Sequence, residues 1–140
     1  NRMRHICHGV ISTAPALTTG SRLVAIESEL AVIIDRFRPE DAAVESLFFA
    51  RNVKTALPVA QARGVILFTL SKSNVPLFEY TPIEVKQAIS GRGRADKHQV
   101  QHMIRILLGL KVIPEPDHAA DALAVAFCHG SFRESGIRFM

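Results

Sequence analysis

The sequence predicts an α/β fold in which helices pack on a mixed sheet. One observation leads to this prediction, and a second concerns the number of domains. Short apolar segments typical of strands alternate along the chain with longer segments in which apolar residues recur at helical spacing. Neither an internal repeat nor a linker divides the 140 residues, so we expect one domain over residues 1–140.

The chain is expected to open with a strand, a helix and a second strand. Residues 4–12 alternate in part between apolar and polar side chains, which predicts a strand. Thr18 and Ser21 offer N-caps for a helix, which Pro39 should end. The apolar run at residues 42–44 is typical of a strand that is buried on both faces.

The middle of the chain predicts two helices separated by a third strand. The first helix covers about residues 52–71, with Asn52 as its N-cap, although Pro58 and Gly64 should bend or weaken it. Residues 76–80 form the strand. The second helix begins within residues 81–84, which combine a Thr cap, a first-turn Pro and a capping-box Glu.

Two further helices are expected near the C-terminus. The first has one apolar side, formed by Val100, Met103, Ile104, Leu107 and Leu108. The second runs from Asp117, its predicted N-cap, to about His129 and ends before Gly130. Its residues 119–126 are small and apolar, so we expect this helix to pack closely against the sheet.

Composition excludes several classes of protein. Hydrophobic residues make up 48% and charged residues 21%, which excludes a disordered chain. The apolar run at residues 64–70 is too short to span a bilayer, so we expect no membrane partner. Two distant cysteines, Cys7 and Cys128, fit free thiols in a reducing cytosol. The net charge of +4 permits a polyanionic partner.

Three side chains could form a site for a divalent metal ion. Glu45 follows the strand at residues 42–44, and ligands bind at the carboxyl ends of such strands. His118 and Asp121 lie three residues apart on the first turns of the last helix and share one face. Each of the three also fits an ordinary solvated position, so the residues alone leave both interpretations open.

A cluster of basic residues could contact nucleic acid. Lys86, Arg92, Arg94 and Lys97 lie close together in sequence, and glycines between the arginines would let the loop follow a phosphate backbone. An ordinary solvated loop explains the same pattern equally well.

Aromatic and basic residues directly follow Glu45. Phe48 could insert between bases near the metal, while Phe49 points into the core. Arg51 and Lys54 add positive charge beside them. A pair of phenylalanines is, however, more often part of a hydrophobic core.

Taken in order, these features resemble the RuvC family, bacterial Holliday-junction resolvases with a ribonuclease-H-like fold. The similar positions extend from about residue 4 to residue 129. The segments that carry the resemblance are 43–52 (AVESLFFARN), 61–65 (QARGV), 85–87 (VKQ), 97–103 (KHQVQHM) and 118–124 (HAADALA).

The resemblance implies roles for individual residues. Glu45 corresponds to the second acidic metal ligand, Asp121 to the last acid, and His118 to a position that is Asp or His in the family. Lys86 and Lys97 correspond to basic residues near the cleaved phosphate. Phe48 corresponds to the aromatic residue that stacks on junction bases.

The resemblance also implies an activity and partners. Two Mg²⁺ ions, or Mn²⁺, would activate a water for symmetric nicking of a four-way DNA junction during recombination and repair. His118 would be a metal ligand or a base. The helix at residues 52–71 resembles the one that forms a homodimer. A branch-migration helicase complex and a bacterial cytoplasmic location are implied as well.

One feature of the family is absent from this sequence. The first catalytic Asp of the family lies on an opening strand with an Asp-Pro-Gly turn, upstream of the position that Asn1 occupies. We therefore expect the sequence to be an N-terminally incomplete resolvase. The alternatives are a non-catalytic module for junction binding or dimerisation, and a related nuclease that acts on another nucleic acid.

Overall fold

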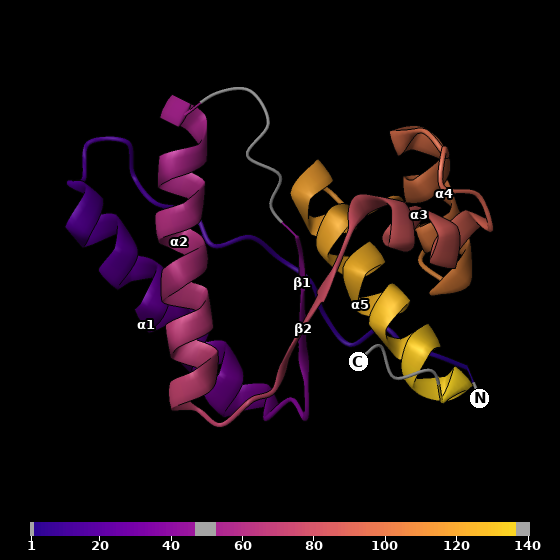
Figure 1. Cartoon of the computed structure of the whole chain (residues 1–140), viewed down its shortest axis with the longest axis horizontal. Coiled ribbons are helices and arrows are strands. Elements are labelled where there is room, and N and C mark those ends of the chain that lie inside the picture. Colours follow the sequence, from indigo (N-terminus) through magenta and orange to yellow (C-terminus); the bar gives the residue numbers. More distant parts are fainter. Residues whose placement is uncertain (1, 47–52, 137–140) are drawn as a thin grey trace. The chain divides into compact units, whose positions relative to one another are not determined.

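The computed structural model describes residues 2–46 and 53–136. In chain order its elements are α1 (Thr19–Phe37), β1 (Ala42–Glu45), α2 (Val53–Lys72), β2 (Leu77–Tyr80), α3 (Pro82–Ser90), α4 (Lys97–Leu107) and α5 (Asp117–Ser135) (Figure 1). None of the helices in these ranges is long and apolar enough to cross a membrane.

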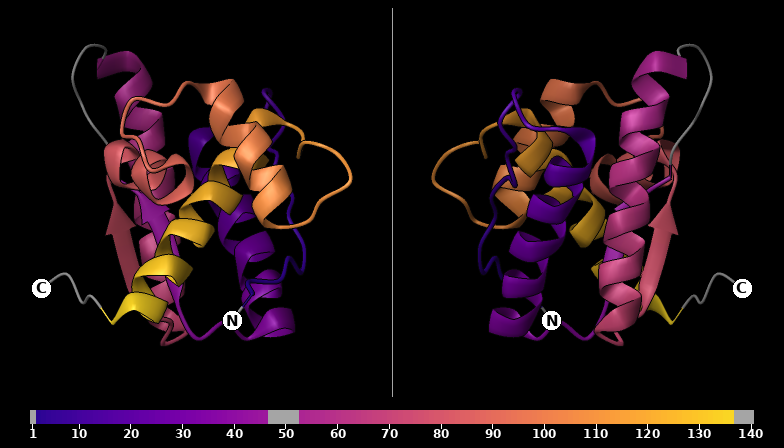
Figure 2. Two further views of the ribbon diagram at one scale, coloured as in Figure 1. Left: turned by 90° about the vertical axis from the view of Figure 1, so that its right-hand side faces the viewer. Right: turned by 90° about the vertical axis from the view of Figure 1, so that its left-hand side faces the viewer.

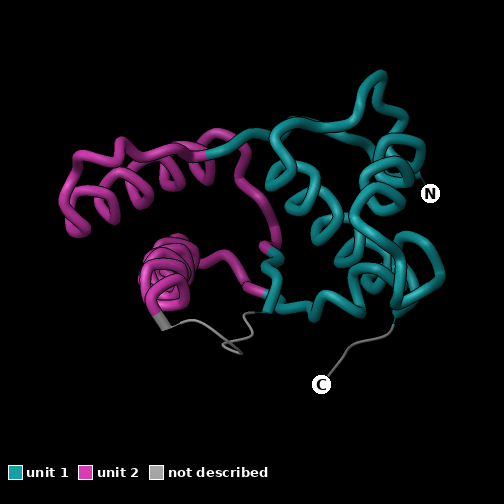
Figure 3. The backbone as a smooth tube through the Cα atoms, turned by 90° about the horizontal axis from the view of Figure 1, so that it is seen from above, with its two compact units in different colours: residues 1–10, 43–46, 78–140 teal, residues 11–42, 47–77 magenta. Residues whose placement is uncertain are grey.

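The chain forms two compact units (Figure 3). One consists of residues 1–10, 43–46 and 78–140, and the other of residues 11–42 and 47–77. We call them unit 1 and unit 2 and describe each separately. The expectation of a single domain stays a prediction.

Strands β1 and β2 pair in parallel. The Ala42 amide donates to the Pro76 carbonyl and the Ser46 amide donates to the Tyr80 carbonyl, each over 2.8 Å. The residue numbers of the bonded partners rise together along the two strands, which is the pattern of a parallel pair. Helix α2 connects β1 to β2, as parallel pairing requires. This arrangement confirms the predicted α/β class.

The expected burial of β1 on both faces is wrong. Ala42, Ala43 and Val44 are each half-buried, and Glu45 is exposed. The reason is that β2 is the only strand hydrogen-bonded to β1 in the described part of the chain, so β1 is not enclosed by a larger sheet.

The expected strand at residues 4–12 is also wrong. This segment is irregular, and both Ile6 and Val10 are exposed. A strand needs a neighbour for its backbone hydrogen bonds, whereas among the described residues β1 and β2 pair with each other alone. Alternation in the sequence supplies no such partner.

Unit 2 is built on the packing of α1 against α2 (Figure 2). The expected cap is present, since the Thr18 hydroxyl accepts a bond from the Ser21 amide over 3.2 Å. Ile34, Leu70 and Val75 form the buried cluster of this unit. Helix α2 continues through Pro58 and Gly64, which were expected to weaken it.

Unit 1 contains α3, α4 and α5, which pack against one another. Both α3 and α4 begin with a capping box, formed by Thr81 with Glu84 and by Asp96 with Gln99. Their core cluster includes Tyr80, at the end of β2, and Ile104, which is fully buried. Ala43 of β1 packs against the same cluster.

Helix α5 differs from its prediction at both ends. Its N-cap is Pro116, and Asp117 is the first residue of the helix rather than its cap. The helix continues past Gly130 to Ser135, and Gly136 takes the left-handed conformation that ends it. A Cβ atom on Gly130 would lie 2.9 Å from the Met3 side chain, so this glycine accommodates a neighbour instead of ending the helix.

Small residues let α5 pack closely, as expected. Ala119, Ala120, Ala124 and Cys128 are almost completely inaccessible to solvent. This face contacts α3 and α4, and its cluster extends to both strands through Ala43 and Tyr80. The packing fixes the direction in which the other face of α5 points.

Candidate functional site

A cavity of about 240 Å³ lies in unit 1, beside the end of β1. Two carboxylates and two amines line it together with an apolar wall. The lining residues are Glu45, Pro82, Val85, Lys86, Lys97, Val100, Asp121, Ala124 and Val125. The cavity thus brings together four of the predicted site residues from β1, α3, α4 and α5.

Glu45 is the last residue of β1, as the sequence predicted. Partial burial raises the pKa of its carboxyl, and the Asp121 carboxylate raises that pKa further, while Lys86 lowers it. The second effect is repulsion between two negative groups, which shows that Glu45 and Asp121 act on each other across the cavity.

His118 and Asp121 share a face of α5, also as predicted. His118 Nδ1 lies 4.0 Å from Asp121 Oδ2. The His118 side chain is 87% exposed and the Asp121 side chain 44% exposed. His118 is not among the residues that line the cavity.

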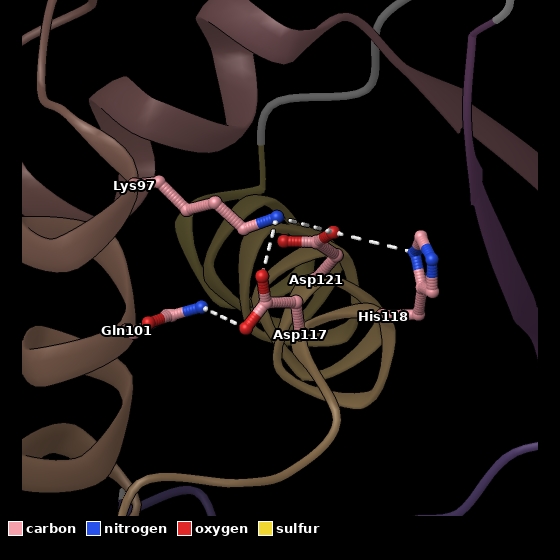
Figure 4. A network of polar contacts seen from close by, with 5 residues as sticks. All are labelled: Lys97, Gln101, Asp117, His118 and Asp121. Atoms are coloured by element: carbon pink, nitrogen blue, oxygen red, sulfur yellow. Dashed lines mark hydrogen bonds and ion pairs between the residues drawn. The ribbon is translucent and has the colours of Figure 1, made fainter.

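A polar network joins the start of α4 to the start of α5 (Figure 4). Lys97 Nζ lies 3.1 Å from Asp117 Oδ2 and 4.0 Å from Asp121 Oδ2. The Gln101 amide donates to Asp117 Oδ1 over 3.1 Å. The hydrogen bond between Lys97 and Asp117 is the main cause of both pKa shifts: it raises the pKa of Lys97 and lowers the pKa of Asp117.

Asp117 and Gln101 are residues that sequence reasoning missed. Asp117 had been assigned to capping, but it makes no cap bond and pairs with Lys97 instead. The available signal was the spacing of Lys97 and Gln101, which stand four residues apart and therefore share one face of α4.

Three further basic residues of the predicted site that the structure describes do not line the cavity. Arg92 and Arg94 are exposed on the loop between α3 and α4. Lys54 is exposed on α2, in unit 2. Phe48, Phe49 and Arg51 lie outside the described residues, as does the predicted cap Asn52.

The cavity fits a divalent cation through its donor chemistry. Two carboxylates that repel each other create a negative potential, which a cation would relieve, and carboxylate oxygen is the ligand that Mg²⁺ prefers. Among the described residues, no group of three His, Cys, Asp or Glu side chains forms a complete metal-binding cluster. Glu45 and Asp121 would therefore make up only part of the coordination sphere of such a cation.

Comparison with known proteins gives a consistent result. The family model for "Crossover junction endodeoxyribonuclease RuvC" matches residues 1–129. A protein of that name from Pseudothermotoga lettingae is 47% identical over 139 residues, covering 99% of this chain and 86% of its own length. Another from Roseiflexus sp. is 50% identical over 127 residues, covering 91% of this chain and 76% of its own length.

Solved structures show the same relationship. The structure of Thermus thermophilus RuvC aligns with a TM-score of 0.88 at 38% identity, covering 96% of this chain and 81% of that one. T. thermophilus RuvC in complex with Holliday junction substrate aligns with a TM-score of 0.91, again at 38% identity, and covers 96% and 82% of the two chains. These neighbours confirm the ribonuclease-H-like α/β fold class. The chain therefore belongs to the RuvC family of crossover junction endodeoxyribonucleases.

Proposed function

We propose that this chain is the nuclease region of a metal-dependent enzyme that resolves four-way DNA junctions by symmetric nicking during recombination and repair. The observation that carries the proposal is the cavity in which the Glu45 and Asp121 carboxylates face Lys86 and Lys97. Paired carboxylates beside lysines are the groups needed to hold cations and a scissile phosphate together. The names of the relatives favour a nuclease over a non-catalytic binding module.

Each residue of the cavity has a distinct task in this proposal. Glu45 and Asp121 would be ligands of two Mg²⁺ ions, with Mn²⁺ as the alternative that an imidazole ligand at His118 would favour. The chemistry supplied by such ions is activation of the attacking water and stabilisation of the leaving oxygen. Lys86 and Lys97, which line the same cavity, would neutralise the negative charge of a scissile phosphate bound there. The exposed His118 imidazole either binds a metal ion or accepts a proton from the water.

Residues outside the cavity would extend the DNA-binding surface. Arg92 and Arg94 are exposed on a loop that begins at Gly91, where φ is +71°, and they would contact phosphates on either side of the cut. Lys54 and Arg51 would add phosphate contacts, and Phe48 would stack on a junction base.

A homodimer through α2 completes the proposal. Leu57, Gly64 and Phe68 recur at positions that share one face of the helix, and all three are exposed. Phe68 is 62% exposed and Leu57 58% exposed, so this face of the helix presents large apolar side chains to solvent. A second copy of the chain would cover this face, and its two-fold symmetry would place two cavities for symmetric cuts.

Two further parts of the proposal rest on family membership. The enzyme would work with a branch-migration helicase bound to the same junction. It would act in the bacterial cytoplasm, where the thiols of Cys7 and Cys128, both free in the structure, would stay reduced.

The proposal is tested with Glu45→Gln and Asp121→Asn in the intact protein. Each variant should reduce cleavage of a four-way junction in Mg²⁺ by orders of magnitude, because each removes a charged ligand, while gel-shift affinity for the junction stays within about threefold. Glu29→Gln, an exposed acid on α1, is the matched control and should cleave normally. Normal cleavage by Glu45→Gln would refute the assignment.

A further inference from the structure

Asp117 has a role beyond the set of residues that the family resemblance supplied. We infer that Asp117 is a positioning residue that holds the Lys97 ammonium at the rim of the cavity and keeps it from closing onto Asp121. The inference rests on the proposed nuclease function, because it concerns how Lys97 is presented to the phosphate.

The geometry fixes Asp117 at both of its oxygens. Oδ2 faces Lys97 Nζ at 3.1 Å, and Oδ1 accepts a hydrogen bond from the Gln101 amide at 3.1 Å (Figure 4). A carboxylate that is bound at one oxygen alone can rotate about its bonds. With both oxygens engaged, Asp117 offers Lys97 a partner at a defined position.

Gln101 is the rigid end of this network. The residue is 7% exposed, and a buried amide needs a hydrogen-bond partner, which Asp117 provides. The adjacent residue Val100 and, three residues on, Ile104 belong to the core cluster of unit 1. Through Gln101, the Asp117 carboxylate is thus anchored to the core of unit 1.

Lys97 would otherwise have a different nearest anion. Its Nζ already lies 4.0 Å from Asp121 Oδ2, and a lysine side chain has enough rotatable bonds to close that gap. A direct Lys97–Asp121 pair would occupy the oxygen that the proposed cation needs. Asp117, which does not line the cavity, supplies a closer anion for Lys97, so Asp121 stays available.

The ion pair of Lys97 with Asp117 contributes little to the stability of the fold. The side chains of Lys97 and Asp117 are 52% and 64% exposed, and ion pairs in such positions contribute little to the free energy of unfolding. Orientation of Lys97 is the property that the geometry supports.

The test compares Asp117→Asn with Glu115→Gln, an exposed acid two residues earlier, in the intact protein. At saturating four-way junction and Mg²⁺, Asp117→Asn should lower the single-turnover cleavage rate roughly 10- to 100-fold, since a misplaced catalytic group costs that much. The junction Kd should change less than about threefold, because the phosphate contacts remain. Glu115→Gln should match the parent, and Asp117→Glu should recover part of the rate.

A double-mutant comparison separates positioning from other roles. If Asp117 acts through Lys97, adding Asp117→Asn to Lys97→Ala should cause no further loss of rate. A second measurement needs neither metal nor activity. Acetylation of Lys97 by an amine-reactive ester, followed by mass spectrometry with exposed Lys111 as the internal reference, should be several-fold faster in Asp117→Asn with Asp121→Asn than in Asp121→Asn alone, because only the double variant leaves Lys97 without either anion.

The outcomes distinguish this inference from the proposed function. An unchanged cleavage rate in Asp117→Asn, or a loss that adds fully to that of Lys97→Ala, would overturn the inference while Glu45→Gln still abolishes cleavage. Unchanged acetylation of Lys97 would overturn it as well. If Glu45→Gln and Lys97→Ala both cleave normally, the nuclease site itself is wrongly assigned.

Discussion

Tyr80 Oη lies 2.7 Å from His129 Nδ1, so a hydrogen bond joins the last residue of β2 to the middle of α5. The Tyr80 ring also stacks on Phe132, with centroids 5.5 Å apart and planes 2° from parallel. Tyr80 therefore connects the sheet to the helix that carries Asp121. Removing the Tyr80 side chain should therefore lower the stability of the protein, and it should lower activity only by shifting α5.

Tyr80→Phe should lower the free energy of unfolding by about 0.5–1.5 kcal/mol, the usual net contribution of one hydrogen bond. The stacking on Phe132 is retained in this variant, so junction binding should not change. Tyr80→Ala should cost roughly 3–5 kcal/mol because it empties a buried aromatic site. Urea denaturation of the two variants measures both values, and equal costs would show that the hydroxyl dominates the interaction.

The two cysteines should differ strongly in reactivity. Cys7 is exposed, whereas Cys128 is buried and its thiol donates to the Glu84 carbonyl over 3.7 Å. Burial raises the pKa of Cys128 from 9.0 to about 11, so its thiolate is scarce at pH 8. Titration with a coloured disulfide reagent should show one fast thiol in the native protein and two after denaturation. A Cys7→Ser variant with a remaining fast thiol would contradict this expectation.

The same shift predicts the direction of alkaline destabilisation. Between pH 9 and 11 the folded protein keeps the Cys128 proton while the unfolded chain loses it, so stability falls as the pH rises through this range. The loss should be about 1.4 kcal/mol per unit of pKa difference. Cys128→Ala should show a flatter decline of Tm over this range than the parent protein.

The α2 face should control association. Phe68→Glu places a charge within the proposed dimer surface, so analytical ultracentrifugation should show a monomer, and the far-ultraviolet circular dichroism spectrum should not change. Phe78→Glu changes an exposed phenylalanine of β2 and serves as the matched control. Dimers of undiminished affinity in Phe68→Glu would place the interface elsewhere.

The basic loop should contribute to the salt dependence of DNA binding. In Lys86→Ala with Arg94→Ala, the slope of log affinity against log salt should become shallower by about one unit for each lost phosphate contact. Arg36→Ala with Arg38→Ala removes the same charge from the end of α1 and is the control. A slope equal to that of the parent would show that the loop is only a solvated surface.

Features fixed by neighbouring residues could be predicted from the sequence. The Thr81 and Glu84 capping box depends on four consecutive residues, and the position of Glu45 at the end of β1 depends on the apolar run before it. The strand predicted at residues 4–12 was wrong because a strand is defined by its hydrogen-bonded neighbour, and the local sequence pattern does not reveal whether one exists. The prediction of Asp117 as the N-cap of α5 was wrong because Pro116 takes that position. The Asp117 carboxylate pairs instead with Lys97 on another helix.

The parts of the site that depend on helix packing were harder to predict. Family resemblance named Lys97 and Asp121, but their separation of 4.0 Å follows from the way α4 and α5 meet. The same packing brings Gln101 to Asp117; the spacing of Lys97 and Gln101 places them on one face of α4 but does not say which residue they meet. Sequence patterns thus identified the charged groups, whereas their mutual arrangement required the tertiary structure.

The alanine face of α5 makes the site vulnerable to uncharged substitutions far from any catalytic group. Ala120 is 2% exposed and does not line the cavity, yet it follows Ala119 and precedes Asp121 on the same turn of helix. A valine or leucine there would push α5 outward and carry Asp121 with it, because a close-packed interior has no spare volume. Loss-of-function variants in this protein should therefore arise at alanines that bind nothing, and an inventory of the acids alone would overlook them.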